Sequence, residues 1–180
     1  MTAYPEAARL HPPSRIIVIK VSANRVQLMT PALFDRVLHQ ARQSPRQRMN
    51  FNFHATLDEN PSRLLNVLLR GTYITPHRHS DPPKSESFVV LEGRIAVFIF
   101  DDTGRVAERH ALGRGDAALG IDIAPGIWHT AAALSDHAVC FEVKPGPYVQ
   151  AVDKEFAPWA PREGDPRCAA YLETLLCDFK

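Results

Sequence analysis

The sequence predicts an all-β domain, an antiparallel sandwich or barrel, flanked by two helices. Short apolar or alternating runs recur at even spacing, and Gly, Pro, Asn and Asp residues separate them. This spacing favours antiparallel strands over alternating β and α units. The run at 95–100 is apolar on both faces, so it should be covered on two sides. We expect strands at residues 64–74, 87–91, 95–100, 106–112, 117–123, 128–134 and 138–144.

The ends of the chain predict different elements. A β-branched run at residues 15–20 predicts a short strand. Thr30 can cap a helix that has Pro31 at its first position. From there apolar residues recur at intervals of three and four until Ser44, which predicts an amphipathic helix. Residues 168–179 predict a final helix.

A chain of 180 residues suits one compact domain with its own core and leaves little room for a second. The expected organisation follows from the patterns above. It comprises a flexible lead-in at 1–14, a strand and helix extension at 15–60, a barrel at 61–150, and a C-terminal loop and helix at 151–180 that packs on the barrel.

Composition narrows the class of partner. Lys and Arg (21) nearly balance Asp and Glu (20), so no electrostatic reason exists to expect nucleic acid or an anionic membrane. Three cysteines without a CxxC pair favour reduced thiols. No apolar run reaches membrane-spanning length, and the first 13 residues lack the apolar core of a signal peptide. We therefore expect a cytoplasmic protein with a small-molecule ligand. We also expect a homodimer, because a strand at residues 16–19 offers an edge that is safer paired.

Four residues form a candidate site for one divalent metal. His77 and His79 are two apart, so on an extended chain both side chains leave the same face. Glu86 begins the next expected strand, where a hairpin partner would place its carboxylate opposite the histidines, and His129 comes from a much later strand. Imidazole and carboxylate ligands suit Fe, Mn, Ni or Zn, and ligand identity alone does not choose among them. The four converge only if the sheet closes on itself.

The pattern Gly71, His77-x-His79, Glu86 and Gly93, followed by Pro125-Gly-x-x-His129, resembles the two cupin motifs, with a longer gap before Glu86 than is usual. A wider resemblance, over residues 33–163, is to the WbuC-type cupin fold metalloproteins. It implies a cupin double-stranded β-helix, or jelly roll, with the metal inside the barrel. It also implies a sugar or nucleotide-sugar ligand in bacterial surface-polysaccharide (O-antigen) metabolism. The segments that carry it are residues 46–54, 64–66, 71–79, 125–130, 144–148 and 156–161.

Further polar residues are candidates for the pocket, because amides, cations and phenols are the groups that a polyhydroxylated or carboxylated ligand needs. His54 and Tyr148 are the candidates for acid and base catalysis. An alternative is that Asn52 caps a turn and that Arg63 and Lys144 are solvated. The candidates for substrate binding are Asn52, Arg63, Asn66 and Lys144.

The sequence leaves three functions open. The first is a metal-dependent enzyme acting on a small polar molecule, as an isomerase, an epimerase or an Fe(II)-type oxygenase of a small organic acid. The second is a non-catalytic sugar-binding or sensor domain. The third is a metal that only closes the barrel.

Overall fold

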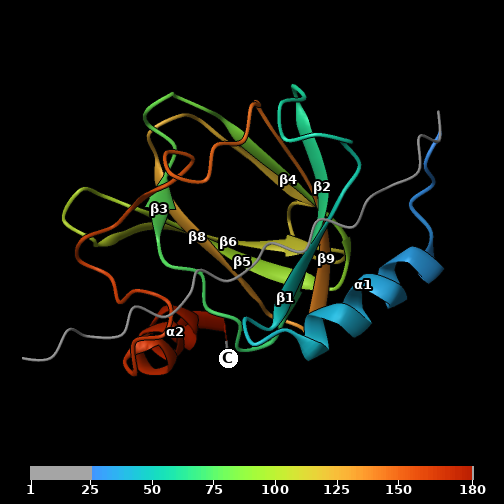
Figure 1. Ribbon diagram of the computed structural model, residues 1–180. Coiled ribbons are helices and arrows are strands. Elements are labelled where there is room, and N and C mark those ends of the chain that lie inside the picture. Colours follow the sequence, from blue (N-terminus) through green and yellow to red (C-terminus); the bar gives the residue numbers. More distant parts are fainter. Residues whose placement is uncertain (1–25, 180) are drawn as a thin grey trace, which may run out of the picture.

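Two five-stranded antiparallel sheets face each other in this protein (Figure 1), and the expected all-β class is confirmed. The computed structural model describes residues 26–179. The predicted lead-in at 1–14 and the strand at 15–20, with the edge at 16–19 on which the expected dimer depends, lie outside the described residues. The strands are β1 (Arg48–Asn52), β2 (Ser62–Leu69), β3 (His77–Arg78), β4 (Glu86–Glu92), β5 (Arg94–Phe100), β6 (Val106–Gly113), β7 (Gly120–Ile123), β8 (Trp128–Ala133), β9 (His137–Lys144) and β10 (Glu155–Phe156).

Each of the seven runs predicted as strands between residues 64 and 144 overlaps a strand, although the strands in the runs at 64–74 and 117–123 are shorter than expected. β2 ends at Leu69, not at residue 74, because the chain turns there: Thr72 N donates to Leu69 O at 3.1 Å and Gly71 has a φ of +86°. In one sheet the strand order is β1-β2-β9-β4-β7, and in the other it is β10-β3-β8-β5-β6.

Both predicted helices are present outside the barrel (Figure 1). Thr30 caps α1 (Pro31–Gln43) by accepting a hydrogen bond from Leu33 N at 3.2 Å, as its sequence predicts. The buried face of α1 packs on β1 and β2. α2 (Cys168–Leu176) runs into a 3₁₀ turn (Cys177–Phe179), and its buried Leu172 and Leu175 join a second apolar cluster beneath β5 and β8.

The interior between the sheets has a polar end and an apolar end. Side chains alternate in direction along a strand, so every second residue faces inward. On β4 the inward series begins with Glu86 and continues with apolar residues, and β8 does the same after His129. Along β2 and β9 the inward-facing residues also change from polar at one end of the interior to apolar at the other. The apolar inward residues on these four strands are Phe88, Val90, Ala131, Ala133, Leu68, Cys140 and Ala138.

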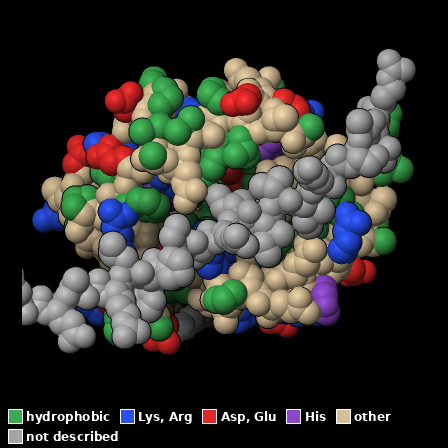
Figure 2. Space-filling model, in the orientation of Figure 1, with side chains coloured by type: hydrophobic (Ala, Val, Ile, Leu, Met, Phe, Trp, Pro, Cys, Tyr) green, Lys and Arg blue, Asp and Glu red, His purple; other side chains and the backbone are tan. Residues whose placement is uncertain are grey.

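Charged side chains of both signs are interspersed on the face seen in Figure 2, in keeping with the small net charge of +1. Among residues 26–179, no helix combines the length and the apolar character needed to cross a membrane.

β5 is covered on both faces, as its sequence predicts. Ile95 and Val97 face the barrel interior, while Ala96, Phe98 and Phe100 face the cluster that α2 completes. We expect Phe98→Ala to lower the free energy of unfolding by about 3–5 kcal/mol, because it opens a cavity at a side chain with no solvent exposure. Denaturant unfolding measures this. The control, Val89→Ala on the exposed face of β4, should change stability by no more than about 0.5 kcal/mol; equal effects would contradict the assignment of this core.

Candidate metal centre

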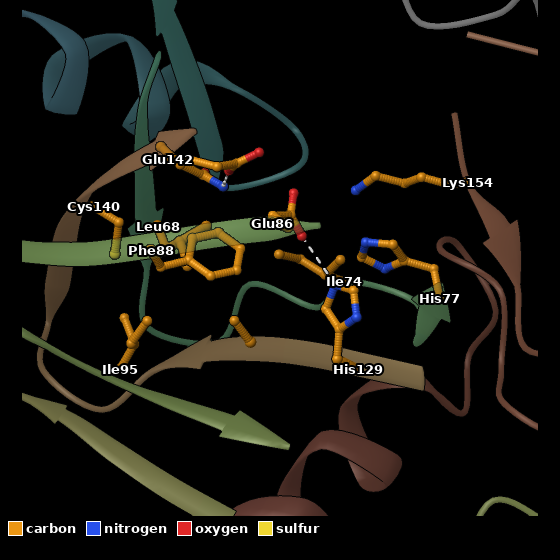
Figure 3. Close-up of a pocket in the computed structure, with 12 residues that line it drawn as sticks. Leu68, Ile74, His77, Glu86, Phe88, Ile95, His129, Cys140, Glu142 and Lys154 are labelled. Atoms are coloured by element: carbon orange, nitrogen blue, oxygen red, sulfur yellow. Dashed lines mark hydrogen bonds and ion pairs between the residues drawn. The ribbon is translucent and has the colours of Figure 1, made fainter. Parts of the chain in front are cut away.

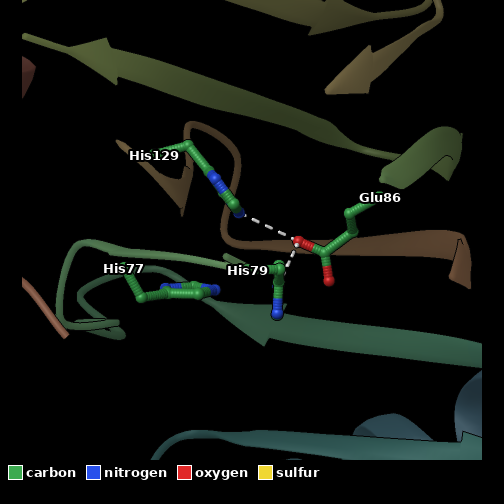
Figure 4. A group of neighbouring side chains, drawn as sticks. All are labelled: His77, His79, Glu86 and His129. Atoms are coloured by element: carbon green, nitrogen blue, oxygen red, sulfur yellow. Dashed lines mark hydrogen bonds and ion pairs between the residues drawn. The ribbon is translucent and has the colours of Figure 1, made fainter. Parts of the chain in front are cut away.

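The fold brings the four predicted metal ligands together. One nitrogen from each of His77, His79 and His129 and one oxygen from Glu86 all lie within 4.8 Å of one another, and all four residues are buried (Figure 4). His77, Glu86 and His129 lie on β3, β4 and β8, and His79 follows directly after β3. They can meet because the two sheets enclose one interior.

The two sheets contribute different ligands. His77 on β3 and His129 on β8 are directly paired across neighbouring antiparallel strands. Its place in the sequence suggested that Glu86 lies on a hairpin partner of β3, but the structure differs. Glu86 is the first residue of β4, which pairs with β7 and β9 in the opposite sheet, so its carboxylate reaches the histidines across the interior.

Backbone carbonyl groups fix the orientation and tautomer of all three imidazoles. A carbonyl oxygen only accepts hydrogen bonds, so each Nδ1 that faces one must carry a proton. A neutral ring then presents an unprotonated lone pair at Nε2, which is the atom that binds metal. The partners are Thr75 O for His77 (3.0 Å), Ile127 O for His129 (2.8 Å) and Asp153 O for His79.

Two inner atoms of the cluster lack a hydrogen-bond partner among residues 26–179. They are the buried Nε2 atoms of His77 and His79. Nε2 of His129 lies 2.9 Å from Glu86 Oε2, and Nε2 of His79 lies 3.5 Å from the same oxygen. In this tautomer a lone pair faces a carboxylate oxygen, an arrangement that repels unless a cation lies between them. The residues therefore fit a divalent metal ion bound by three nitrogens and one oxygen.

The electrostatics favour the unprotonated forms of two of the donors, His77 and Glu86. Burial, followed by the positive charge of Lys154, holds the pKa of His77 well below its ordinary 6.5. Burial alone would raise the pKa of Glu86, but the nearby Lys144 ammonium favours the ionised form, and that pKa lies well below 4.5. Metal binding requires neutral imidazole and ionised carboxylate, which are the forms favoured at His77 and Glu86.

Two of the predicted substrate-binding residues lie at this centre. Lys144 is buried, with Nζ 3.6 Å from Glu86 Oε1 and 3.0 Å from Asp153 Oδ2, so the alternative of a solvated Lys144 is wrong. Asn66 lines the adjacent cavity and donates to Glu142 Oε2 at 2.9 Å.

The cavity beside the cluster is small, with about 30 Å³ open to the centres of water-sized molecules. Its apolar lining comes from the interior described above, and its polar lining gathers at one end (Figure 3). That polar lining consists of Asn66, His77, Glu86, His129, Glu142 and Lys154.

Two of these residues were not predicted from the sequence. Glu142 stands two residues before Lys144 on β9, so the alternation that put Lys144 in the barrel puts Glu142 there also. Burial and the nearby Glu86 raise the pKa of Glu142 to about 7. Lys154 lies in a Pro-rich segment without periodicity, so no local signal could have found it.

The other predicted site residues lie outside the cavity lining. Nδ1 of His54 lies 3.1 Å from the backbone nitrogen of Arg63 and 2.9 Å from its carbonyl oxygen, which ties β1 to β2. The Arg63 guanidinium pairs with Glu59 at 2.7 Å. Tyr148 places its ring 5.8 Å from Lys144 Nζ, and Asn52 is paired with the backbone of β2. Their catalytic and substrate-binding roles stay predictions.

Comparison with known proteins adds the following. A family model described as a domain of unknown function, DUF6016, matches residues 29–112, slightly less than half of the chain. A search of curated proteins finds no match. Among solved structures, the capsular polysaccharide assembling protein CapF from Staphylococcus aureus is similar, with a TM-score of 0.52 and 19% identity over 63% of this chain and 32% of CapF. Protein SO0799 from Shewanella oneidensis is similar over 72% of this chain and 85% of its own, with a TM-score of 0.51 and 11% identity.

Two facing five-stranded sheets with inward histidines from β3 and β8 decide the architecture. The chain has a cupin fold. It spans about a third of the length of CapF, and at such low identity the likeness concerns the fold alone.

The buried state of His77 in this cupin barrel predicts a pH dependence of stability in metal-free protein. As the pH falls below about 6.5, the unfolded chain takes up a proton on this residue and the folded chain does not. The contribution of His77 is therefore present above this pH and lost below it. We expect wild type to lose more unfolding free energy than His77→Gln between about pH 7 and about pH 5, measured by urea titration. The exposed His110, changed to Gln, is the control; an unchanged slope in His77→Gln would contradict the prediction.

Proposed function

We propose that this protein binds one divalent transition metal through His77, His79, Glu86 and His129, and that metal and cavity together bind a small polar ligand. The convergence of three Nε2 lone pairs on one carboxylate carries the proposal, since the buried Nε2 atoms of His77 and His79 have no hydrogen-bond partner among the described residues. Fe, Mn, Ni and Zn all suit this ligand set.

The chain supplies the setting for chemistry on a ligand. A metal at this position would act as a Lewis acid that polarises a carbonyl or hydroxyl oxygen of the ligand. The backbone carbonyls hold the imidazoles in place, and the apolar lining from β2, β4, β8 and β9 limits the entry of water. Glu142, held by Asn66, presents a carboxyl group that can exchange a proton with the ligand. This arrangement supports an isomerase or epimerase.

We propose that the ligand is a sugar or nucleotide-sugar of bacterial surface-polysaccharide metabolism. The resemblance of residues 33–163 to WbuC-type cupins supports this, and so does the name of CapF, a capsular polysaccharide assembling protein of the same fold. The small cavity admits part of such a ligand, so a nucleotide would remain outside.

The size of the cavity also favours a second candidate, an oxygenase of a small organic acid, because a ligand of a few heavy atoms would fit inside. Turnover that requires O₂ separates this candidate from an isomerase. Stoichiometric ligand binding without turnover would instead support the sugar-binding or sensor alternative. A cytoplasmic location and a homodimer stay predictions from the sequence.

Metal content tests the centre directly. Wild type purified without added metal or affinity tag should contain about one metal ion per chain, and His77→Ala should bind metal at least about tenfold more weakly. Elemental analysis after dialysis measures both. His110→Ala, on the exposed face of β6, should keep the metal; stoichiometric metal in His77→Ala would overturn the site.

Chelation separates a functional metal from one that only closes the barrel. Three apolar clusters hold the sheets and helices together, so far-ultraviolet circular dichroism should stay unchanged after the metal is removed. The unfolding free energy should still rise on metal addition, by about 2.7 kcal/mol at a free concentration about 100 times Kd. A metal-free chain that is unfolded would favour the purely structural role.

A further inference from the structure

Ion pairs on both sides of Lys154 hold the chain around the start of β10 at the edge of the cavity. The Asp153 carboxylate is buried between Lys84 (3.0 Å) and Lys144 (3.0 Å). Two residues later, the Glu155 carboxylate accepts two hydrogen bonds from the Arg78 guanidinium, each at 2.8 Å. Lys154 lies between these anchors, so its backbone position is fixed from both sides.

The side chain of Lys154 points into the cavity, with its ammonium toward the side where Glu86 and His77 lie (Figure 3). Within residues 26–179, neither an ion pair within 4.0 Å nor a hydrogen bond engages its Nζ atom. Lys84 and Lys144, by contrast, each have a carboxylate at 3.0 Å. Burial and the charge of Lys144 lower the pKa of Lys154, as expected for an ammonium that lacks a close anion.

The balance of charge in this interior points to a negative ligand. Three carboxylates meet three ammonium groups in and beside the cavity, so their formal charges cancel when all are ionised. A divalent metal would then leave two positive charges in excess in a largely apolar barrel, where uncompensated charge is costly. The groups are Glu86, Glu142 and Asp153 against Lys84, Lys144 and Lys154.

We propose that Lys154 binds a carboxylate group of the ligand inside the barrel, beside the metal. The inference rests on the metal site proposed above and adds the chemical class of the ligand. A carboxylate fits the small cavity, and its charge offsets both the unpaired ammonium and the excess left by the metal. The attraction between an ammonium group and a carboxylate is strongest where water is excluded. Lys154 is thus a specificity-determining residue that favours acidic over neutral ligands.

Glycolate and glycolamide test the proposal, because they share a hydroxyl group and nearly the same shape but differ in charge. Calorimetric titration into the Zn(II)-loaded full chain should show glycolate binding about ten- to hundredfold more tightly than glycolamide. Lys154→Met should remove this preference by weakening glycolate about ten- to hundredfold while glycolamide stays unchanged. Arg114→Met, which removes an exposed charge far from the described site residues in sequence, is the matched control and should behave as wild type.

The Zn(II) content of each sample distinguishes failure of the metal site from failure of the role of Lys154. Wild type that takes up no Zn(II) would overturn the metal site itself. Equal Zn(II) in wild type and Lys154→Met, with unchanged glycolate affinity, would overturn only the role of Lys154. Equal affinity of wild type for glycolate and glycolamide, or no affinity for either, would also overturn it, and this comparison needs no variant. Lys154→Gln replaces Lys154→Met if the apolar side chain prevents folding.

Discussion

The centre depends on three hydrogen bonds from imidazole Nδ1 atoms to backbone carbonyl oxygens. Because Thr75 O, Ile127 O and Asp153 O only accept, they determine which nitrogen of each ring is protonated and aim every Nε2 lone pair at one point. Two of these carbonyls lie two residues before the histidine that they hold. The third comes from the segment before β10, so the docking of that C-terminal segment helps to build the centre.

Around this centre the protein keeps several charges out of water, and their mutual pairing limits the cost. Lys144 bridges Glu86 and Asp153, and Lys84 completes the pairing of Asp153. Removing one member of such a network leaves an uncompensated buried charge, whereas the intact network adds little net stability. Its value here is positional, because it holds Glu86 ionised and fixes the segment that carries Lys154. Stability instead comes from the three apolar clusters.

Much of the fold could be predicted from local patterns. Thr30 and Pro31 mark the start of α1, and the alternation along β9 places both Lys144 and Glu142 inward. The pattern failed at residues 70–74, which were predicted to continue the strand although Arg70, Gly71 and Thr72 interrupt the apolar run and the chain turns there. Beyond the turn, Tyr73 and Ile74 pack against the apolar clusters from irregular chain, and hydrophobicity alone does not distinguish this from a strand.

The sequence by itself determined the residue types and spacing of the metal centre, because a two-residue interval on an extended chain forces His77 and His79 to one face. Only the tertiary structure decided that Glu86 meets them from the opposite sheet, since strand pairing depends on contacts distant in sequence. The tertiary structure also decided that His54 ties two strands together outside the cavity and that Lys154 enters the cavity. No local period encodes where a loop docks, which is set by the ion pairs and backbone hydrogen bonds that form when the barrel closes.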